Sequence, residues 1–505
     1  MPKRSWVLLL AGFVLLPWTE LQTTIALAAW VAPALLLRFS RTAQSGWRSW
    51  ISIVVVYTVA SLISLRNGLL PIPFGFLLLL AVATALVRSV PYTLDRWLNL
   101  RLRALSRSLV FPVCMTSMEW LAMRYSPYGS WGSTAYSQYY DLPLIQIVSI
   151  TGIAGLTFLV HWIAPVLNAL AEETPGTRHS RAPAVAFGTV LALALGYGGV
   201  RLALAGRDAH AVTVAAVVPS ESEYDRTFAG ADLTALAGAD LNALAGASDS
   251  ARLLAGTRFN ANADRLFART IEAAKLGARV IAWPEYVPVL DEDHPAMLKA
   301  ARSVAQENHI YLLITPLVIM KASRFPYLQN LTVLVDPSGE VRWRYPKSYP
   351  VVGLETESYG RGAGHVFVAQ TRVGRVSSAI CQDLDFPWLI RKIGMQKASL
   401  LIGPSDDWRA IERTHAHMAV FRAIENGFSL LRPANNGISE AVDPYGRVRA
   451  MSASSEVGQT MMLAALPTQR VPTIYARLGD WFAWCCVAGM IWFIALMGPP
   501  LERRS

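Results

Sequence analysis

Apolar residues are distributed unevenly along this chain, and that distribution limits the possible fold more than any other feature. Long apolar runs fill residues 5–205 and 478–497, whereas residues 206–477 have the mixed composition of a soluble α/β protein. A helix that crosses the hydrocarbon core of a bilayer needs about 20 apolar residues. The sequence therefore predicts a globular domain held between membrane-spanning helices.

Eight apolar runs are candidate transmembrane helices, and the globular region precedes the last of them. They cover about residues 5–18, 20–38, 50–65, 68–87, 108–123, 142–169, 183–205 and 478–497. The sixth run is long enough to contain a kink, and no small-residue cleavage site follows the first, which is therefore expected to remain uncleaved. The predicted domains are a helical bundle over 1–205, a catalytic domain over 206–468, and a last helix with its tail over 469–505.

The distribution of basic residues predicts the orientation. With the N-terminus inside, the inner segments hold Lys3, Arg4, Arg38, Arg41, Arg48, Arg88, Arg96, Arg101, Arg103, Arg107, Arg178, Arg181, Arg503 and Arg504, and the outer ones only Arg66, Arg124, Arg201 and Arg207. Loops rich in Lys and Arg stay in the cytoplasm, so the globular domain is expected on the outer, periplasmic face. The net charge of +11 then reflects topology, and no nucleic-acid partner is predicted.

The globular region alternates predicted strands with helices and hairpin turns, which favours a layered α/β sandwich. No Gly-rich phosphate loop follows a strand, and no Cys/His spacing suits zinc, so no cofactor or metal is expected. An eight-residue repeat occupies residues 229–246. It is interpreted as a low-complexity insertion, with a neutral surface segment and a mobile helical flap as the two alternatives.

Three reactive side chains follow predicted strands in the globular region. They are Glu285 in Ile281-Ala-Trp-Pro-Glu-Tyr, Lys347 in Arg344-Tyr-Pro-Lys, and Cys381 in Val376-Ser-Ser-Ala-Ile-Cys-Gln-Asp. A thiol attacks a carbonyl as its thiolate, so Glu285 is expected to act as general base. Lys347 is expected to lower the pKa of the thiol and to stabilise an oxyanion. Taken singly, the three would be a turn carboxylate, a solvated lysine and a buried core thiol.

Residues 206–468 resemble the nitrilase superfamily of carbon–nitrogen hydrolases, whose Glu-Lys-Cys triad corresponds to Glu285, Lys347 and Cys381. The whole chain resembles the bacterial apolipoprotein N-acyltransferase family, in stretches such as Gly129-Ser-Trp-Gly, Tyr136-Ser-Gln-Tyr-Tyr-Asp, Phe421-Arg-Ala-Ile-Glu and Leu431-Arg-Pro-Ala-Asn-Asn-Gly. The resemblance implies an αββα sandwich inserted in a membrane bundle of the bacterial inner membrane. It also implies transfer of a fatty acyl chain from a phospholipid to the N-terminal amine of a diacylated lipoprotein, and a monomer is expected.

Several residues around the triad match the family or depart from it. By the resemblance, Glu355 is a second glutamate that orients Lys347, although Glu355 or Glu357 could also be a plain surface carboxylate. Gln382 and Asp383 stand where the family has an aromatic residue and Glu, and the segment Pro404-Ser-Asp-Asp-Trp408 replaces an Asn-Asp-x-Trp-Phe-Gly loop.

Gln382, Asp383 and Trp408 are therefore predicted to line the substrate entrance. Because they differ from the family, two alternatives stay open. One is a membrane acyltransferase or amidase with another acceptor, and the other is a non-catalytic protein that binds lipid or peptide.

Overall fold

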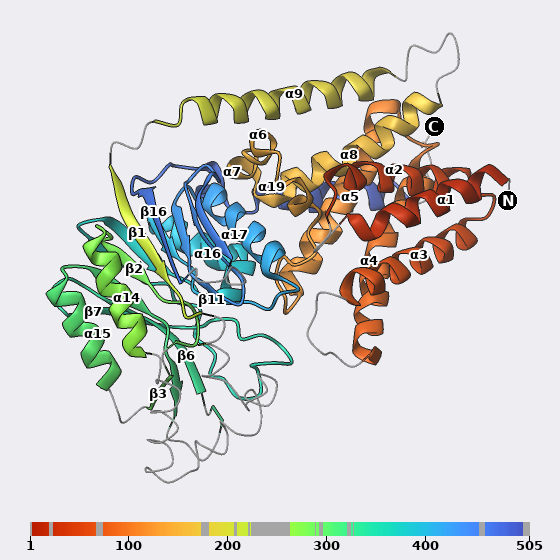
Figure 1. The fold of residues 1–505 in the computed structure, drawn as a ribbon. Coiled ribbons are helices and arrows are strands. Elements are labelled where there is room, and N and C mark those ends of the chain that lie inside the picture. Colours follow the sequence, from red (N-terminus) through yellow and green to blue (C-terminus); the bar gives the residue numbers. More distant parts are fainter. Residues whose placement is uncertain are drawn as a thin grey trace. The chain divides into compact units, whose positions relative to one another are not determined.

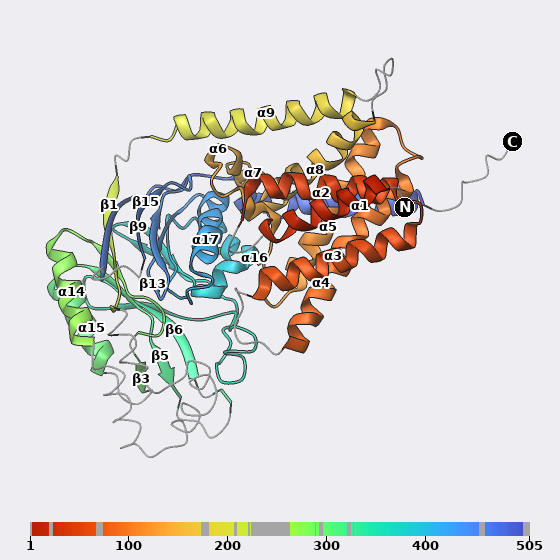
Figure 2. The same ribbon diagram turned by 45° about the vertical axis from the view of Figure 1, so that its right-hand side comes forward.

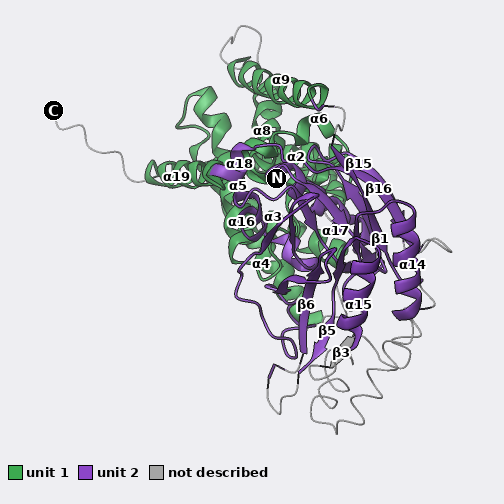
Figure 3. Cartoon of the chain, turned by 90° about the vertical axis from the view of Figure 1, so that its left-hand side faces the viewer, with its two compact units in different colours: residues 1–204, 478–505 green, residues 205–477 purple. Residues whose placement is uncertain are grey.

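The structure, a computed structural model, divides into two compact units. It describes residues 3–19, 24–66, 74–172, 181–206, 210–220, 223, 263–287, 289–291, 296–320, 325–326, 328–453 and 460–497. One unit comprises residues 1–204 and 478–505, and the other residues 205–477 (Figure 3). Residues 469–477, which the sequence grouped with the last helix, pack with the globular unit instead. The repeat at 229–246 lies outside the described residues.

The first unit is helical throughout. Its helices are α1 (Lys3–Leu15), α2 (Ala26–Thr42), α3 (Gly46–Arg66), α4 (Phe74–Leu98), α5 (Ala104–Tyr125), α6 (Leu142–Ile145), α7 (Val148–Thr151), α8 (Ile153–Ala171), α9 (Arg181–Ala203) and α19 (Trp481–Ala495) (Figure 1). The run predicted over 142–169 is broken into three helices. Gly152, between α7 and α8, has a φ of +64°, which favours glycine because a side chain is strained there.

Among the described residues, four helices are long and apolar enough to cross a membrane, so the prediction of eight spans is not confirmed. They are Gly46–Leu65, Phe74–Leu98, Ile153–Ala171 and Arg181–Ala203, while Ser5–Trp18, Leu142–Thr151 and Trp481–Ala495 are apolar but shorter. One physical reason is that charged residues lie inside other helices. Arg38 and Arg41 belong to α2, and Arg107 and Glu119 to α5. The sequence had placed these three arginines in loops.

The globular unit contains two mixed β-sheets. The larger has the order β16–β1–β2–β4–β6–β5–β3, with β7 paired to β6, and the smaller has the order β15–β14–β12–β10–β9–β8. The strands of the larger sheet are β1 (Ala211–Val217), β2 (Val280–Ala282), β3 (Val289–Asp291), β4 (Tyr311–Ile314), β5 (Leu317–Ile319), β6 (Leu328–Val335), β7 (Val341–Pro346) and β16 (Met461–Pro467). Those of the smaller are β8 (Val368–Thr371), β9 (Gly374–Ser378), β10 (Leu400–Ile402), β12 (Ser429–Arg432), β14 (Ile438–Val442) and β15 (Val448–Ala453). A short separate pair joins β11 (Ser405–Asp406) to β13 (Ala434–Asn435).

The two sheets pack face to face, and helices cover their outer faces (Figure 2). Side chains alternate between the two faces of a strand. In β1, Val214 and Ala216 join the core between the sheets, whereas Ala215 and Val217 pack with α14 (Ala263–Lys275) and α15 (Ala296–Glu307). The outer face of the smaller sheet is covered by α17 (Glu412–Asn426), which packs against β12 and β14 and against α16 (Pro387–Met395). The result is a nitrilase-like α/β fold.

Strand direction determines where the reactive residues lie. β1, β2 and β4 are parallel neighbours in one sheet, and β9, β10 and β12 are parallel neighbours in the other. Glu285 follows β2, Cys381 follows β9, and Ser405 follows β10. Because parallel strands present their carboxyl ends at one edge of a sheet, these residues are brought to the same end of the sandwich.

Candidate active site

Glu285 is buried and its carboxylate is held by three donors. Oε1 accepts hydrogen bonds from Lys347 Nζ at 2.8 Å and from Asn330 Nδ2 at 2.6 Å, and Oε2 accepts one from the Asp406 amide at 3.0 Å. The carbonyl of Glu285 accepts a further bond from Asn435 Nδ2 at 2.7 Å. Both oxygens are therefore fixed in direction, which a base that must reach one particular proton requires.

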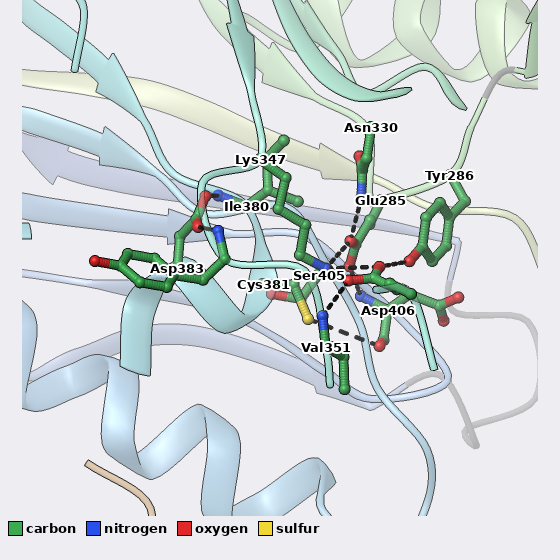
Figure 4. A network of polar contacts seen from close by, with 12 residues as sticks. Glu285, Tyr286, Asn330, Lys347, Val351, Ile380, Cys381, Asp383, Ser405 and Asp406 are labelled. Carbon is green, nitrogen blue, oxygen red and sulfur yellow. Dashed lines mark hydrogen bonds and ion pairs between the residues drawn. The ribbon is translucent and has the colours of Figure 1, made fainter. Parts of the chain in front are cut away.

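Lys347, directly after β7, lies between two carboxylates. Its ammonium donates to Glu285 at 2.8 Å and to Glu355 Oε1 at 2.9 Å, and the side chain is buried. Burial by itself lowers the pKa of a lysine, but here Glu285 and Glu355 together raise the pKa of Lys347 well above its ordinary value. The ammonium is charged at neutral pH and pairs with both carboxylates, and Figure 4 shows Lys347 beside Glu285.

Cys381 begins a short 3-10 helix, Cys381–Asp385, three residues after β9 ends. Its φ is +46°, a conformation that few residues other than glycine adopt and that recurs at functional sites. The amide of Cys381 donates to Pro404 O at 2.8 Å, and Sγ lies 3.9 Å from Asp406 O. The thiol also interacts with the carboxylate of Glu285. The structure thus brings Glu285, Lys347 and Cys381 together.

The protonation state of the thiol differs from the sequence-based expectation. Burial, followed by the charge of Glu285, raises the pKa of Cys381 well above its ordinary value, and the opposing effect of Lys347 is smaller. The pKa of Glu285 is raised as well, by burial and by Glu355. Cys381 is therefore a neutral thiol at rest: Lys347 lowers its pKa in the expected direction, but by less than burial and Glu285 raise it. A carboxylate base with a raised pKa is well matched to removing this proton as the thiol attacks.

The four supporting residues lie in different surroundings. Glu355 is buried and accepts hydrogen bonds from Lys347 and Tyr286, and its Oε2 accepts one from the Val351 amide at 2.6 Å. It therefore orients the lysine, and the reading as a surface carboxylate is wrong for Glu355. Glu357 is exposed.

The carboxylate of Asp383 accepts hydrogen bonds mainly from backbone amides, and the described residues show none from Lys347. Its Oδ1 accepts from the amides of Ser348 and Tyr349 at 3.0 and 2.8 Å, and its Oδ2 from the Ile380 amide at 3.1 Å and from the hydroxyl of Tyr345 at 2.6 Å. Burial raises the pKa of Asp383 to about 6, and these hydrogen bonds limit the shift. Asp383 thus joins the segment after Lys347 to the segment before Cys381.

Gln382 is buried beside Cys381, and Trp408 is half-buried two residues after Asp406. The indole Nε1 of Trp408 is shielded from solvent and has no hydrogen-bond partner among the described residues. The placement of these two residues in the substrate entrance stays a prediction.

Sequence reasoning missed several polar residues that lie around the triad. They are Tyr286, Asn330, Asp406, Asp407, His415, Arg432 and Asn435. Asn435 and Arg432 stood inside the quoted stretch Leu431–Gly437, so their signal was available. Asn330 and His415 lie in segments that read as an ordinary strand and an ordinary helix.

One cluster next to the thiol has the spacing of a metal site. Ligand atoms of Cys381, Asp407 and His415 lie within 4.8 Å of one another. However, Arg432 Nη2 contacts both Asp407 oxygens, at 2.9 and 2.7 Å. Asp385 and Asp407 outweigh the effect of burial and raise the pKa of His415 to about 9, so the imidazole is charged at neutral pH. A metal ligand must be a neutral imidazole, so these residues fit an ion-pair network better than a metal site.

Comparisons with known proteins match both units of the chain. The model of the carbon–nitrogen hydrolase family matches residues 243–474, and that of the apolipoprotein N-acyltransferase N-terminal domain matches residues 5–166. The chain is similar to an apolipoprotein N-acyltransferase of Geobacter metallireducens, with 26% identity over 97% of this chain and 94% of the relative. It is also similar to one of Bradyrhizobium diazoefficiens, with 28% identity over 74% of this chain and 70% of the relative.

Among solved structures, an amidase from Nesterenkonia sp. aligns with 55% of this chain, over 95% of its own length. The sequence identity is 20% and the TM-score is 0.39, so the similarity is low. The two family models match one unit each, and the Geobacter relative matches nearly the whole chain. The chain thus joins an apolipoprotein N-acyltransferase N-terminal domain to a carbon–nitrogen hydrolase domain, as an enzyme of the N-acyltransferase kind.

Proposed function

We propose that the protein transfers a fatty acyl chain from a phospholipid to the N-terminal amine of a diacylated lipoprotein, through a thioester on Cys381. The observation that carries this proposal is the buried contact of Lys347 with Glu285, 2.8 Å apart, beside the thiol. The relatives are named for N-acylation of apolipoproteins. The candidate spans in the helical unit are consistent with a lipid as the acyl donor.

The first half-reaction forms the acyl-enzyme. Glu285 takes the proton of Cys381 as sulfur attacks the ester carbonyl of the phospholipid, and the developing oxyanion is stabilised by the ammonium of Lys347. When the intermediate collapses, the ester C–O bond breaks and Glu285 returns its proton to the departing lysophospholipid alcohol. Fixed orientation of both Glu285 oxygens by Lys347, Asn330 and the Asp406 amide supports this role.

The second half-reaction uses the same groups. The neutral N-terminal amine of the lipoprotein attacks the thioester carbonyl, Lys347 again stabilises the oxyanion, and Glu285 accepts a proton from the attacking nitrogen. Cleavage of the C–S bond yields the amide, and the sulfur regains a proton. No redox step or cofactor is needed for this balance.

We further propose that the globular unit faces the periplasm and that the chain acts as a monomer in the inner membrane. Basic residues support this orientation, because several meet where α2, α4, α5 and α8 begin or end. Arg41 pairs with Asp95 at 2.8 Å, and Arg38 pairs with Glu172 at 2.6 Å, with Arg107 at 3.7 Å from the same carboxylate. A reporter that is active only outside the cytoplasm, fused after residue 206, should be active in this orientation.

The central test uses the full-length protein in detergent. Incubation with phospholipid should add one acyl mass to Cys381, detected by intact mass and peptide mapping, and a diacylated lipopeptide should then remove it and become triacylated. The Cys381→Ala variant should form no adduct. Absence of an adduct on the wild-type protein would reject the thioester mechanism, whereas release of free fatty acid without lipopeptide acylation would indicate a hydrolase.

A further inference from the structure

A second group of buried charges lies next to Cys381 and has no part in the proposed mechanism. Asp407 Oδ1 is 2.7 Å from His415 Nδ1, and His415 Nε2 is 3.4 Å from Asp385. Arg432 contacts both oxygens of Asp407 and donates to Ile438 O at 2.8 Å. These side chains are buried, and they come from the helix η5 (Cys381–Asp385), the segment after β11, α17 and β12.

The residue before Asp407 connects this group to the proposed base and nucleophile. The amide of Asp406 donates to Glu285 Oε2 at 3.0 Å, and its carbonyl lies 3.9 Å from Cys381 Sγ. Asp406 therefore contacts both reacting side chains through its backbone alone. The short pairing of β11 with β13 ends at Asp406, and one further backbone bond, from the Asp407 amide to Asn435 O at 3.0 Å, follows it.

We infer that Asp407 is a positioning residue. Its buried ion pair with Arg432 and its bond to His415 hold the backbone N–H and C=O of Asp406 between Glu285 and Cys381. The inference rests on the roles proposed above for Glu285 and Cys381. Asp407 touches neither substrate nor the reacting bond in this scheme. It acts through the peptide next to it, which fixes the distance and direction between base and thiol.

Two observations indicate that Asp407 with its partners Arg432 and His415, here called the anchor, is closely packed. A Cβ added to Gly437 would overlap the carboxylate of Asp407 and would lie 2.8 Å from the Cβ of Asp407. The loop after β13 can therefore approach Asp407 this closely only with glycine at position 437. Asn436, the preceding residue, has a φ of +49° and donates to Asp406 Oδ1 at 3.2 Å. Asp406 and Asp407 are thus held from the same loop.

The charge of Asp407 provides a readout that a purely structural role would not give. Cys381 is faced by Glu285 and Asp407, which raise the pKa of the thiol, and by Lys347, which lowers it. His415 is in turn faced by Asp385, Asp407 and Arg432, and Glu440 from β14 lies near the same group. Removing the negative charge at 407 should therefore shift the titration of the thiol to lower pH.

The test compares two variants that disturb the anchor in different ways. Asp407→Asn keeps the shape and removes the charge, whereas Gly437→Ala keeps the charge and displaces the side chain. Asp443→Asn is the matched control, because Asp443 is an equally buried carboxylate, 3.1 Å from Arg449, in the turn between β14 and β15. The full-length proteins are assayed for acyl-enzyme formation from phospholipid, for the pH dependence of Cys381 alkylation by iodoacetamide, resolved by peptide mass, and for thermal unfolding.

Both anchor variants should form the acyl-enzyme about tenfold to a hundredfold more slowly, because a displacement of about 1 Å between reacting groups costs that much. The alkylation midpoint should move to lower pH in Asp407→Asn, move less in Gly437→Ala, which keeps the charge, and stay in place in Asp443→Asn. Wild-type rates in both anchor variants, or equal losses in Asp443→Asn, would overturn the inference. If the wild-type chain forms no acyl-enzyme at all, the proposed function fails, and the alkylation midpoint still decides whether Asp407 acts on Cys381.

Discussion

Replacing Lys347 by methionine tests the charge balance of the site, because the change leaves two buried carboxylates without their common cation. Glu285 and Glu355 lie 2.8 and 2.9 Å from Nζ. At an effective dielectric constant of about 20, each contact corresponds to about 6 kcal/mol of Coulomb attraction. Most of the lost Coulomb attraction is offset, because the variant no longer has to remove an ammonium group from water. Breaking a buried ion pair by removing one partner typically costs a net ~3–5 kcal/mol.

The expected result is a fall of about 10 °C in the unfolding temperature of the globular unit, followed by tryptophan fluorescence. The penalty should depend on pH with a defined sign. Burial already raises the folded-state pKa of Glu285, and loss of Lys347, whose charge lowers that pKa, raises it further above its unfolded value, so stability is retained at low pH and lost as pH rises. The penalty should therefore be largest at pH 8 and shrink towards pH 5.

Two further variants make this prediction decisive. Lys392→Met is the control, because Lys392 is exposed and its ammonium donates to Gly364 O at 3.0 Å rather than to a carboxylate; it should change the unfolding free energy by less than about 0.5 kcal/mol. The double variant Lys347→Met/Glu355→Gln should regain part of the lost stability but no activity. If Lys347→Met unfolds like Lys392→Met, or if its penalty is the same at pH 5 and pH 8, the account of this network is refuted.

Three more predictions concern other parts of the chain. Asp383→Asn should remove a pH-dependent contribution: because burial raises the folded pKa to about 6, wild-type stability falls relative to the variant by about 2 kcal/mol as pH rises from 4 to 6, measurable as unfolding temperature against pH, and a constant difference would contradict this. Glu119→Leu should loosen the helical unit, since Glu119 accepts hydrogen bonds from Ser133, Thr134 and Thr157; faster proteolysis after residue 126 would show it, and unchanged proteolysis would count against this role. Gly198→Leu should displace α9 from α6, because a Cβ at 198 would strike Pro143 O; a lower unfolding temperature is expected in detergent, whereas Gly188→Leu, where a Cβ meets nothing within 4 Å, should have no effect.

Much of the architecture could be read from the sequence, because it depends on local pattern. Residues 211–218 form a continuous apolar run, a pattern typical of a strand covered on both faces, and β1 has that environment. The pairing of sheets into a layered sandwich followed from the alternation of strands, helices and hairpins. The number of spans did not follow, because apolar length alone cannot show that Gly152 interrupts a run or that arginines lie within helices.

The candidate site, like the fold, could be predicted from the sequence only in part. Glu285, Lys347 and Cys381 were identifiable because each follows a strand in a distinctive short motif, and Glu355 because it lies eight residues after the lysine. Their environment was not identifiable. The neutral state of the thiol follows from burial, which raises its pKa by more than Lys347 lowers it, and burial of this residue depends on the tertiary structure.

By itself, then, the sequence indicated the residues that we propose carry the chemistry and the apolar runs that precede and follow them in the chain, since both are encoded in neighbouring residues and their spacing. The tertiary structure alone decided how these residues are held. Asn330, Asp406 and Asn435 reach Glu285 from segments 45, 121 and 150 positions away along the chain. Such contacts depend on how two sheets and their loops close around a buried charge, and no local pattern specifies that closure.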